Sequence, residues 1–142
     1  MDDVEAGDFI VIDQSGVDVG LMGSANSLGG VHRGVRGYVS NGSARDTDEI
    51  VLQQVPFWCK FSSQKMDQGR IQFDAKDVPV AVGGVVVYPG DVVVADGDGV
   101  IVVPRKIAFD VAKYAHRELS NDKVDRRKLY ELLGMELDDT VL

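Results

Sequence analysis

The stretch GYVSNGSARDTDEI, residues 37–50, sets the fold of this chain because its character changes halfway. The first part, Gly37 to Gly42, has the composition of a β-strand and ends at a glycine turn. The second part, Asp46 to Ile50, is rich in acids, as the first turn of a helix often is. A strand, a sharp turn and a helix in this order predict one α/β unit.

Two elements are expected before this unit. Phe9 to Ile12 follows the Gly7-Asp8 turn as a short apolar run, which predicts a strand covered on both faces. Small residues from Gly23 to Gly34 predict a helix, although the adjacent glycines 29 and 30 each cost about 1 kcal/mol in helix propensity. Glycines kept at this cost usually allow close approach of a backbone or a ligand, so this segment is predicted to be tightly packed or functional.

The middle of the chain is rich in β-forming residues. Residues 56–61 predict a strand, and 62–77 predict a polar, irregular loop with a possible short strand at Ile71-Gln72-Phe73. Four valine-rich runs follow between residues 80 and 103, separated by Gly-Gly, Pro-Gly-Asp and Asp-Gly turns. Closely spaced strands with such turns predict a compact, largely antiparallel β unit.

The C-terminal part is predicted to be helical. Apolar residues spaced for one helix face predict a helix over 105–119, and a second one is expected at about 126–133, stopped by Gly134. The whole chain is therefore predicted to be an α/β protein: a single-domain mixed β-sandwich or small barrel flanked by helices, residues 1–142, with 105–142 as a C-terminal helical extension of the same domain.

Composition excludes several classes of function. Fifteen basic against 23 acidic residues give a formal net charge of -8, which argues against binding to nucleic-acid phosphates. No run approaches the roughly 20 apolar residues that cross a bilayer, and the N-terminus lacks the features of a signal peptide, so a cytoplasmic protein without membrane contact is expected. Cys59, the only cysteine, rules out an intramolecular disulfide and lies in an apolar run that predicts a buried thiol.

Several apparent motifs are better explained by structure. Aspartates alternate with glycines in residues 89–91 and 96–99, but an EF-hand would need more oxygen ligands and flanking helices, so hairpin turns are predicted. The two pairs of adjacent glycines, Gly29-Gly30 and Gly83-Gly84, do not belong to a dinucleotide-binding fingerprint. His32 and His116 are isolated, which favours solvated or core histidines over a catalytic triad.

Arg45 and Asp46 are the strongest candidates for a site, because they stand side by side where a strand gives way to a helix. A guanidinium presents a planar fork suited to a substrate carboxylate, and a carboxylate is a hard ligand suited to magnesium or manganese. The alternative on these residues alone is a surface ion pair followed by helix N-terminal acids.

Residues 37–46 and 79–104, taken together, resemble the RraA-like family, which includes the regulator of ribonuclease activity A, 4-hydroxy-4-methyl-2-oxoglutarate aldolases and oxaloacetate decarboxylases. The resemblance implies a fold of the swivelling-domain type and a lyase that depends on a divalent metal, Mg2+ or Mn2+. Such a lyase cleaves a 4-hydroxy-2-oxo diacid to pyruvate, or decarboxylates oxaloacetate, through a metal-stabilised pyruvate enolate. The alternative within the family is a non-catalytic binding protein that inhibits ribonuclease E.

The resemblance also implies roles for individual residues. Asp46 matches the metal aspartate, Arg45 the arginine that contacts substrate oxygens, and Glu49 the acid found after this pair in catalytic members. The amides of Gly23-Ser24-Ala25-Asn26 match the stretch that binds the pyruvyl carboxylate at a helix N-terminus. Glu118 lies roughly where family enzymes carry a glutamate that reaches a neighbouring subunit's site, and a plain surface helix residue is the alternative. Retention of Arg45-Asp46 favours a lyase, since purely regulatory members tend to replace the aspartate.

The chain departs from the family pattern in two ways. A glycine of the family motif falls on Ser24 here, with Gly23 one residue earlier. Related chains usually carry about 50 to 80 further residues before the position of Gly7, on the scale of common domain sizes, so the usual N-terminal segment is expected to be missing. Related proteins form trimers or hexamers, and a homo-oligomer is expected. Substrate choice is expected to depend on side chains of the 62–77 loop.

Overall fold

The computed structural model describes residues 3–142, which divide into two compact units, one up to Val102 and the other from Val103 onward. The first unit contains a sheet, two helices and most of the hairpin strands, and the second contains one long helix and the C-terminal tail. Each unit is described by itself below.

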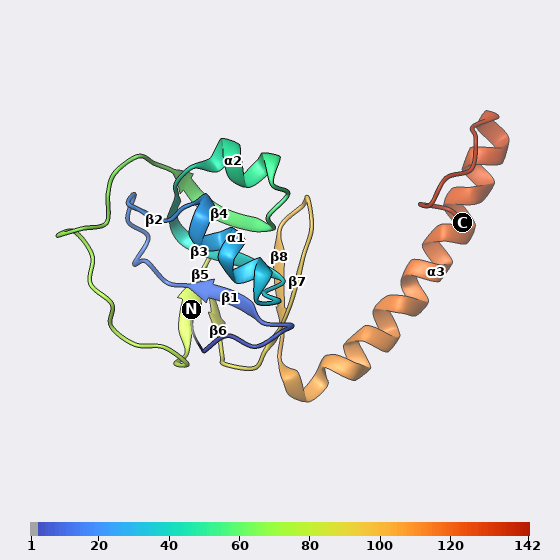
Figure 1. The fold of residues 1–142 in the computed structure, drawn as a ribbon. Helices are drawn as coiled ribbons and strands as arrows, with labels where there is room; N and C mark the ends of the chain where they lie inside the picture. Colours follow the sequence, from blue (N-terminus) through green and yellow to red (C-terminus); the bar gives the residue numbers. More distant parts are fainter. Residues whose placement is uncertain (1–2) are drawn as a thin grey trace. The chain divides into compact units, whose positions relative to one another are not determined.

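A four-stranded parallel sheet organises the first unit (Figure 1). Its strands are β1 (Phe9–Ile12), β2 (Gly20–Met22), β3 (Gly37–Ala44) and β4 (Phe57–Ser62). Residues 37–40 of β3 pair with β1, and Ser43 and Ala44 pair with β2. β4 pairs with Tyr38 through Ala44. Since β4 occupies one edge of β3 along this whole length, β1 and β2 must follow one another along the other edge.

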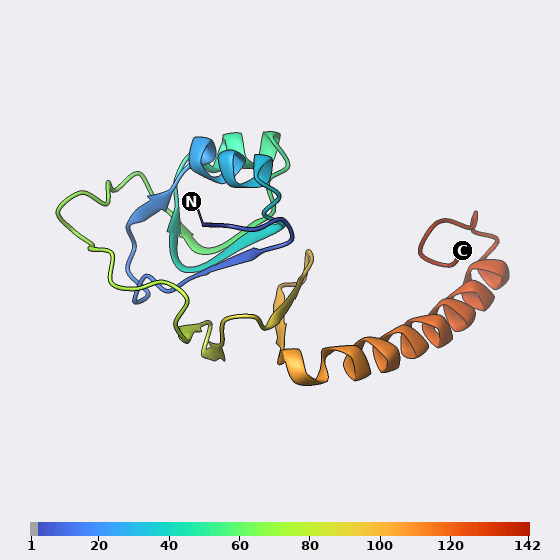
Figure 2. The same ribbon diagram turned by 60° about the horizontal axis from the view of Figure 1, so that its bottom comes forward.

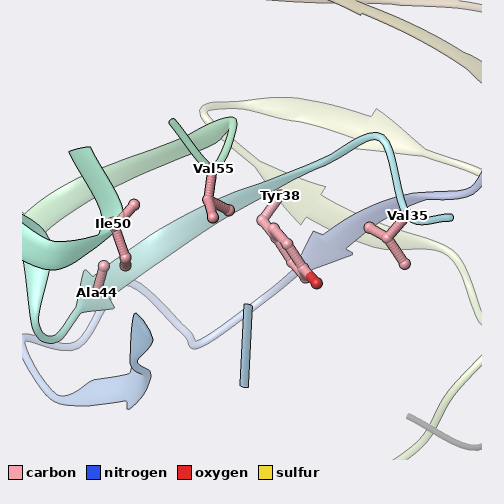
Figure 3. Close-up of a cluster of buried hydrophobic side chains, with 5 residues drawn as sticks. All are labelled: Val35, Tyr38, Ala44, Ile50 and Val55. Atoms are coloured by element: carbon pink, nitrogen blue, oxygen red, sulfur yellow. The ribbon is translucent and has the colours of Figure 1, made fainter. Parts of the chain in front are cut away.

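Helices α1 (Ser24–His32) and α2 (Thr47–Leu52) cover one face of this sheet (Figure 2). The core between the layers contains five fully or nearly buried side chains, shown in Figure 3: Val35, Tyr38, Ala44, Ile50 and Val55. Tyr38 is its largest member and is 0% exposed. Its ring stacks on Phe57 at 5.3 Å between centroids, and its hydroxyl donates a 2.8 Å hydrogen bond to the carbonyl of Ser27 in α1. Burial raises the pKa of Tyr38.

Two hairpins complete the strands: β5 (Val80–Val82) with β6 (Val85–Val87), and β7 (Val92–Ala95) with β8 (Val100–Val103). The β5–β6 pair is antiparallel. It is joined to the sheet by Asn41, which donates to the Ala81 carbonyl, and by Asp13, which accepts from the Ala81 amide. A hydrogen bond from Asn41, together with backbone amides, holds the pKa of Asp13 below its ordinary value.

The aspartates of the valine-rich segment are turn residues, as predicted. The Asp91 carboxylate accepts from the Tyr88 amide, and that of Asp96 accepts from the amides of Asp98 and Gly99. Side chains that bond their own turn backbone stabilise the hairpin without any bound cation.

The second unit consists of a short 3-10 helix (Arg105–Ile107), the helix α3 (Ala108–Leu133) and a tail. α3 ends at Gly134, whose φ of 65° gives the left-handed C-terminal cap for which glycine is favoured. The tail turns back, so that Val141 is buried and the Lys123 ammonium reaches the carbonyls of Asp139 and Leu142. No helix within residues 3–142 is long and apolar enough to cross a membrane.

The predicted α/β fold with mixed strands and a C-terminal helical part is confirmed, and three details are corrected. The two expected C-terminal helices are one continuous helix, because residues 120–125 contain neither glycine nor proline to interrupt it. Ile71-Gln72-Phe73 is not a strand and belongs to the loop. Cys59 is exposed and not buried, because β4 is paired on one side only and its side chains from Cys59 onward face solvent.

The hydrogen bond from Tyr38 ties the central strand to α1, and its removal should be measurable. Tyr38→Phe keeps the ring and deletes the buried hydroxyl, so the free energy of unfolding should fall by about 1 kcal/mol. Urea unfolding followed by circular dichroism tests this, with the exposed Tyr88→Phe as the matched control. A Tyr38→Phe protein as stable as the unmodified chain would contradict the assigned role.

Candidate functional site

The predicted site residues come from two parallel strands that end at the same edge of the sheet. β3 leads directly into Arg45 and Asp46, and β2 leads into Gly23 and Ser24 at the start of α1. β2 lies beside the last residues of β3. The carboxyl ends of parallel strands are where ligands bind in open α/β sheets, so the topology brings the residues together where a site is expected.

Asp46 turns the chain from β3 into α2. Its backbone lies in the left-handed region, with φ 56° and ψ 41°, which is uncommon for a residue other than glycine. Such conformations cost of order 1 kcal/mol and concentrate at functional sites. In this conformation the Asp46 carboxylate faces α1, and its Oδ2 accepts a 3.4 Å hydrogen bond from the amide of Ser24.

The Asp46 carboxylate places a negative charge at the N-terminus of α1, which has no capping side chain and no acidic residue of its own. The cap of this helix is Gly23, which has no side chain to accept a hydrogen bond, and the first turn carries no acid. Unpaired amides and the helix dipole favour an anion at this end. A Cβ on Gly23 would lie 2.4 Å from Asp46 Oδ2, so a larger residue here would displace this carboxylate.

Ser24 connects the two helices at the site. Its hydroxyl donates a hydrogen bond to the carboxylate of Glu49 in α2, and the residue is buried. Of the predicted residues, Gly23, Ser24, Asp46 and Glu49 therefore lie together. Ala25 and Asn26 occupy the exposed first turn of α1.

Arg45 is held from three sides. Its amide donates to the carbonyl of Met22, at 2.8 Å, and its side-chain Nε lies 4.0 Å from Asp46 Oδ1. One terminal nitrogen contacts the sulfur of Met66 at 2.8 Å. A sulfur is a weak acceptor, so this contact positions the guanidinium without satisfying it as a carboxylate would. The Arg45 side chain remains 27% exposed and available to an anion.

Of the predicted site residues, Arg45, Asp46 and Glu49 line a cavity of about 780 Å³. Residues 45–49 form one wall, and residues 62–65, at the end of β4 and the start of the long loop, form the other. The loop is fixed to the sheet because the Ser63 amide donates to the Ala44 carbonyl at 3.0 Å and the Gly20 amide donates to the Lys65 carbonyl at 2.9 Å. The cavity thus has two walls that are both anchored to strands.

An ion pair that the sequence does not predict lies at the loop wall. Lys65 Nζ lies 2.5 Å from Asp18 Oδ2, and Ser43 donates a 2.8 Å hydrogen bond to Asp18 Oδ1. The hydrogen bond from Lys65, followed by those from Ser43 and Ser63, keeps the pKa of Asp18 below its ordinary value. The partners are 47 residues apart in sequence, so no local pattern reveals the contact.

The donor set at the cavity fits a hard divalent cation. Within residues 3–142, no three His, Cys, Asp or Glu side chains gather closely enough to form a metal cage. Mg2+ does not require such a cage, because it keeps several water ligands and uses one or two carboxylates together with substrate oxygens. Asp46 provides one carboxylate, and Asp48 and Glu49 line the same cavity. Softer ions that prefer thiolate would find no cysteine among the lining residues.

Glu118 belongs to α3 in the second unit and is exposed. Its carboxylate accepts hydrogen bonds of 3.2 and 3.1 Å from the neighbouring Arg117. Its role at an active site stays a prediction.

Comparison with known proteins gives a consistent family. The family profile described as RraA-like, Aldolase/RraA, matches residues 1–102. A Halalkalibacterium halodurans protein provisionally named as a 4-hydroxy-4-methyl-2-oxoglutarate aldolase is 31% identical over 139 residues, covering 91% of this chain and 61% of that protein. A Thermus thermophilus protein named 4-hydroxy-4-methyl-2-oxoglutarate aldolase is 32% identical over 107 residues, covering 70% of this chain and 61% of its own length.

Solved structures agree with these matches. The crystal structure of a Streptomyces coelicolor protein, described as an unusual member of the RNase ES inhibitor RraA family, superposes with a TM-score of 0.81 at 32% identity. That match covers 89% of this chain and 65% of the other. The chain thus spans about three fifths of the length of the two aldolase-named relatives.

The contact between Gly23 and Asp46 predicts opposite effects of two glycine substitutions in one helix. Gly23→Ala should push the Asp46 carboxylate away from α1 and lower the free energy of unfolding by about 0.5 to 1 kcal/mol, because the helix loses its N-terminal anion. Gly29→Ala should raise it by up to about 1 kcal/mol, since a Cβ there meets only the Arg33 side chain at 3.9 Å. Urea unfolding of both variants measures the difference, and equal stabilisation by both would refute the assigned contact.

Proposed function

Because the chain belongs to the RraA-like, Aldolase/RraA family, we propose that it is a divalent-metal-dependent lyase that forms pyruvate from short 2-oxo diacids. Its reactions would be the retro-aldol cleavage of a 4-hydroxy-2-oxo diacid and the decarboxylation of oxaloacetate. The observation that carries the proposal is the convergence of Arg45, Asp46, Ser24 and Glu49 at one end of the sheet. All of these except Ser24 line the cavity.

Each residue has a distinct part in the proposed site. Arg45 directs its guanidinium at the oxygens of the 2-oxo acid, where the planar fork can donate two hydrogen bonds. Asp46 would hold Mg2+ or Mn2+, which supplies Lewis-acid stabilisation of the negative charge on the 2-oxo oxygen. Ser24 presents its amide at the N-terminus of α1, and Glu49 fixes Ser24 through its hydroxyl, which makes Glu49 a positioning residue.

Both proposed reactions break the bond between C3 and C4 and leave its electron pair on the pyruvate fragment. In the retro-aldol reaction the 4-hydroxyl loses its proton and becomes a carbonyl, whereas in decarboxylation the C4 carboxylate leaves as carbon dioxide. In both, C3 then gains a proton and pyruvate is released. Negative charge grows on the 2-oxo oxygen only as the bond breaks, so the positive charge of Arg45 favours the transition state over the bound substrate.

Two relatives with aldolase names, at 31% and 32% identity, support this proposal. The presence of both Arg45 and Asp46 supports the lyase proposal further. One cavity thereby contains a cation suited to the substrate and a carboxylate suited to a metal ion.

A coupled pyruvate-release assay tests the proposal with oxaloacetate and with 4-hydroxy-4-methyl-2-oxoglutarate, each with Mg2+, with Mn2+ and with chelator. We expect turnover that depends on the metal and falls on the order of 100-fold or more in Arg45→Ala and Asp46→Ala. Glu136→Ala, which removes an exposed acid of the C-terminal tail outside the cavity, serves as the control and should retain activity. Unchanged pyruvate production in Asp46→Ala would refute the role of this residue.

A second candidate function is that of a regulatory protein that binds ribonuclease E. The structural similarity to the Streptomyces coelicolor member of the RNase ES inhibitor family favours it, as does the net charge of -8, which suits a basic partner surface. Binding of the purified chain to ribonuclease E at micromolar concentration, measured by surface plasmon resonance, tests it. We expect no binding if the chain is only a lyase, and saturable binding would establish the regulatory function.

A further inference from the structure

We propose that Lys65 selects substrates that carry a second carboxylate, by pairing with this group at the loop wall of the cavity. This inference rests on the proposed function, in which Arg45 and Asp46 take the 2-oxo acid end. It assigns a specificity-determining role to a residue outside that catalytic group.

Among the described residues, only two positively charged side chains line the cavity: Arg45 on one wall and Lys65 on the other. Both residues approach Gly20 closely: a Cβ built there would lie 3.2 Å from the Arg45 Cβ and 3.4 Å from the Lys65 carbonyl oxygen. The Lys65 backbone is also fixed by its hydrogen bond from the Gly20 amide. A diacid in the cavity therefore meets one cation at each wall, and both are attached to strand β2 or β3.

The present partner of Lys65 can be exchanged at little cost. The side chains of Lys65 and Asp18 are 58% and 41% exposed, and exposed ion pairs contribute little to stability. Asp18 keeps the hydrogen bond from Ser43 when the ammonium moves away. A substrate carboxylate can thus replace Asp18 as the partner of Lys65, while Asp18 stays satisfied.

The chemistry predicts which kinetic constant depends on Lys65. In the retro-aldol reaction the second carboxylate does not react, so its contact with Lys65 is equally strong in the bound substrate and in the transition state. Such uniform binding lowers KM and leaves kcat unchanged. Loss of the Lys65 charge should therefore raise KM for a diacid, and a monoacid should be unaffected.

A binding experiment tests the role of Lys65 without requiring turnover. 2-Oxoglutarate and 2-oxopentanoate share the 2-oxo acid end, differ in the second carboxylate and lack the 4-hydroxyl that cleavage needs. Isothermal titration calorimetry of both, with Mg2+ present, compares the unmodified chain with Lys65→Met. We expect the Kd for 2-oxoglutarate to rise about tenfold or more, as for loss of a charge-assisted contact, and the Kd for 2-oxopentanoate to change less than about twofold.

Three further variants serve as controls. Lys60→Met removes the same charge from β4, where the ammonium lies 5.0 Å from the Phe61 ring centroid and outside the cavity, and should leave both Kd values unchanged. Lys65→Arg should restore most of the affinity for 2-oxoglutarate. Asp18→Asn frees Lys65 and should bind 2-oxoglutarate at least as tightly as the unmodified chain.

The possible outcomes separate this inference from the proposed function. Equal weakening of both ligands in Lys65→Met, or no weakening of either, overturns the role of Lys65 and leaves the lyase proposal in place. Failure of the unmodified chain to bind either ligand overturns both. A selective loss for 2-oxoglutarate, together with a raised KM and unchanged kcat for 4-hydroxy-4-methyl-2-oxoglutarate, supports both.

Discussion

The backbone pairing of β3 is the constraint on which the rest of the first unit depends. This strand bonds to β1 and β2 along one edge and to β4 along the other, so every strand of the parallel sheet is placed relative to it. Tyr38 of this strand holds α1 through its hydrogen bond to the Ser27 carbonyl. Asn41 of the same strand holds the β5–β6 hairpin through its hydrogen bond to the Ala81 carbonyl. Both layers that lie against the sheet are thus attached to one strand.

The same constraint builds the candidate site. Parallel pairing directs the end of β2 and the end of β3 to one edge, so the start of α1 and the Arg45-Asp46 pair meet there without any contact local in sequence. The left-handed conformation of Asp46 then determines the direction of its carboxylate. Three local departures from ordinary structure occur together at this site. Asp46 has a strained backbone conformation, the N-terminus of α1 has no capping side chain of its own, and the buried Ser24 bonds to Glu49.

The sequence predicted those parts of the fold that depend on local patterns. The apolar run at 9–12, the small residues at 23–34 and the strand-to-helix change at 37–50 correspond to β1, α1, β3 and α2. The helix stop at Gly134 was predicted from glycine chemistry. β2 was missed because its three residues are too few to show a periodic pattern, and the exposure of Cys59 was missed because an apolar run does not tell whether a strand lies at the edge of a sheet.

The candidate site was predicted through family resemblance and not through physics alone. Arg45 next to Asp46 also fits a surface ion pair, and the structure indeed places their charged atoms only 4.0 Å apart and partly exposed. The surroundings of the pair distinguish the two interpretations: Ser24 and Glu49 from neighbouring helices lie beside it, and Arg45, Asp46 and Glu49 line one cavity. These contacts join residues more than 20 positions apart, which periodicity and composition cannot reveal.

The close approach of the loop to β2 depends on the absence of a side chain at Gly20. Gly20 lies between the two walls, where a Cβ would come within 2.6 Å of the Ser63 carbonyl oxygen and 3.2 Å of the Arg45 Cβ. Any larger residue would push the loop away from β2, and Lys65 would move with it because its carbonyl is bonded to the Gly20 amide. Contact at Gly20 therefore limits how far apart the backbones of Arg45 and Lys65 can lie. In proteins such contact is stiffer than the flexible stems of arginine and lysine, so the site combines a fixed frame with mobile charged ends.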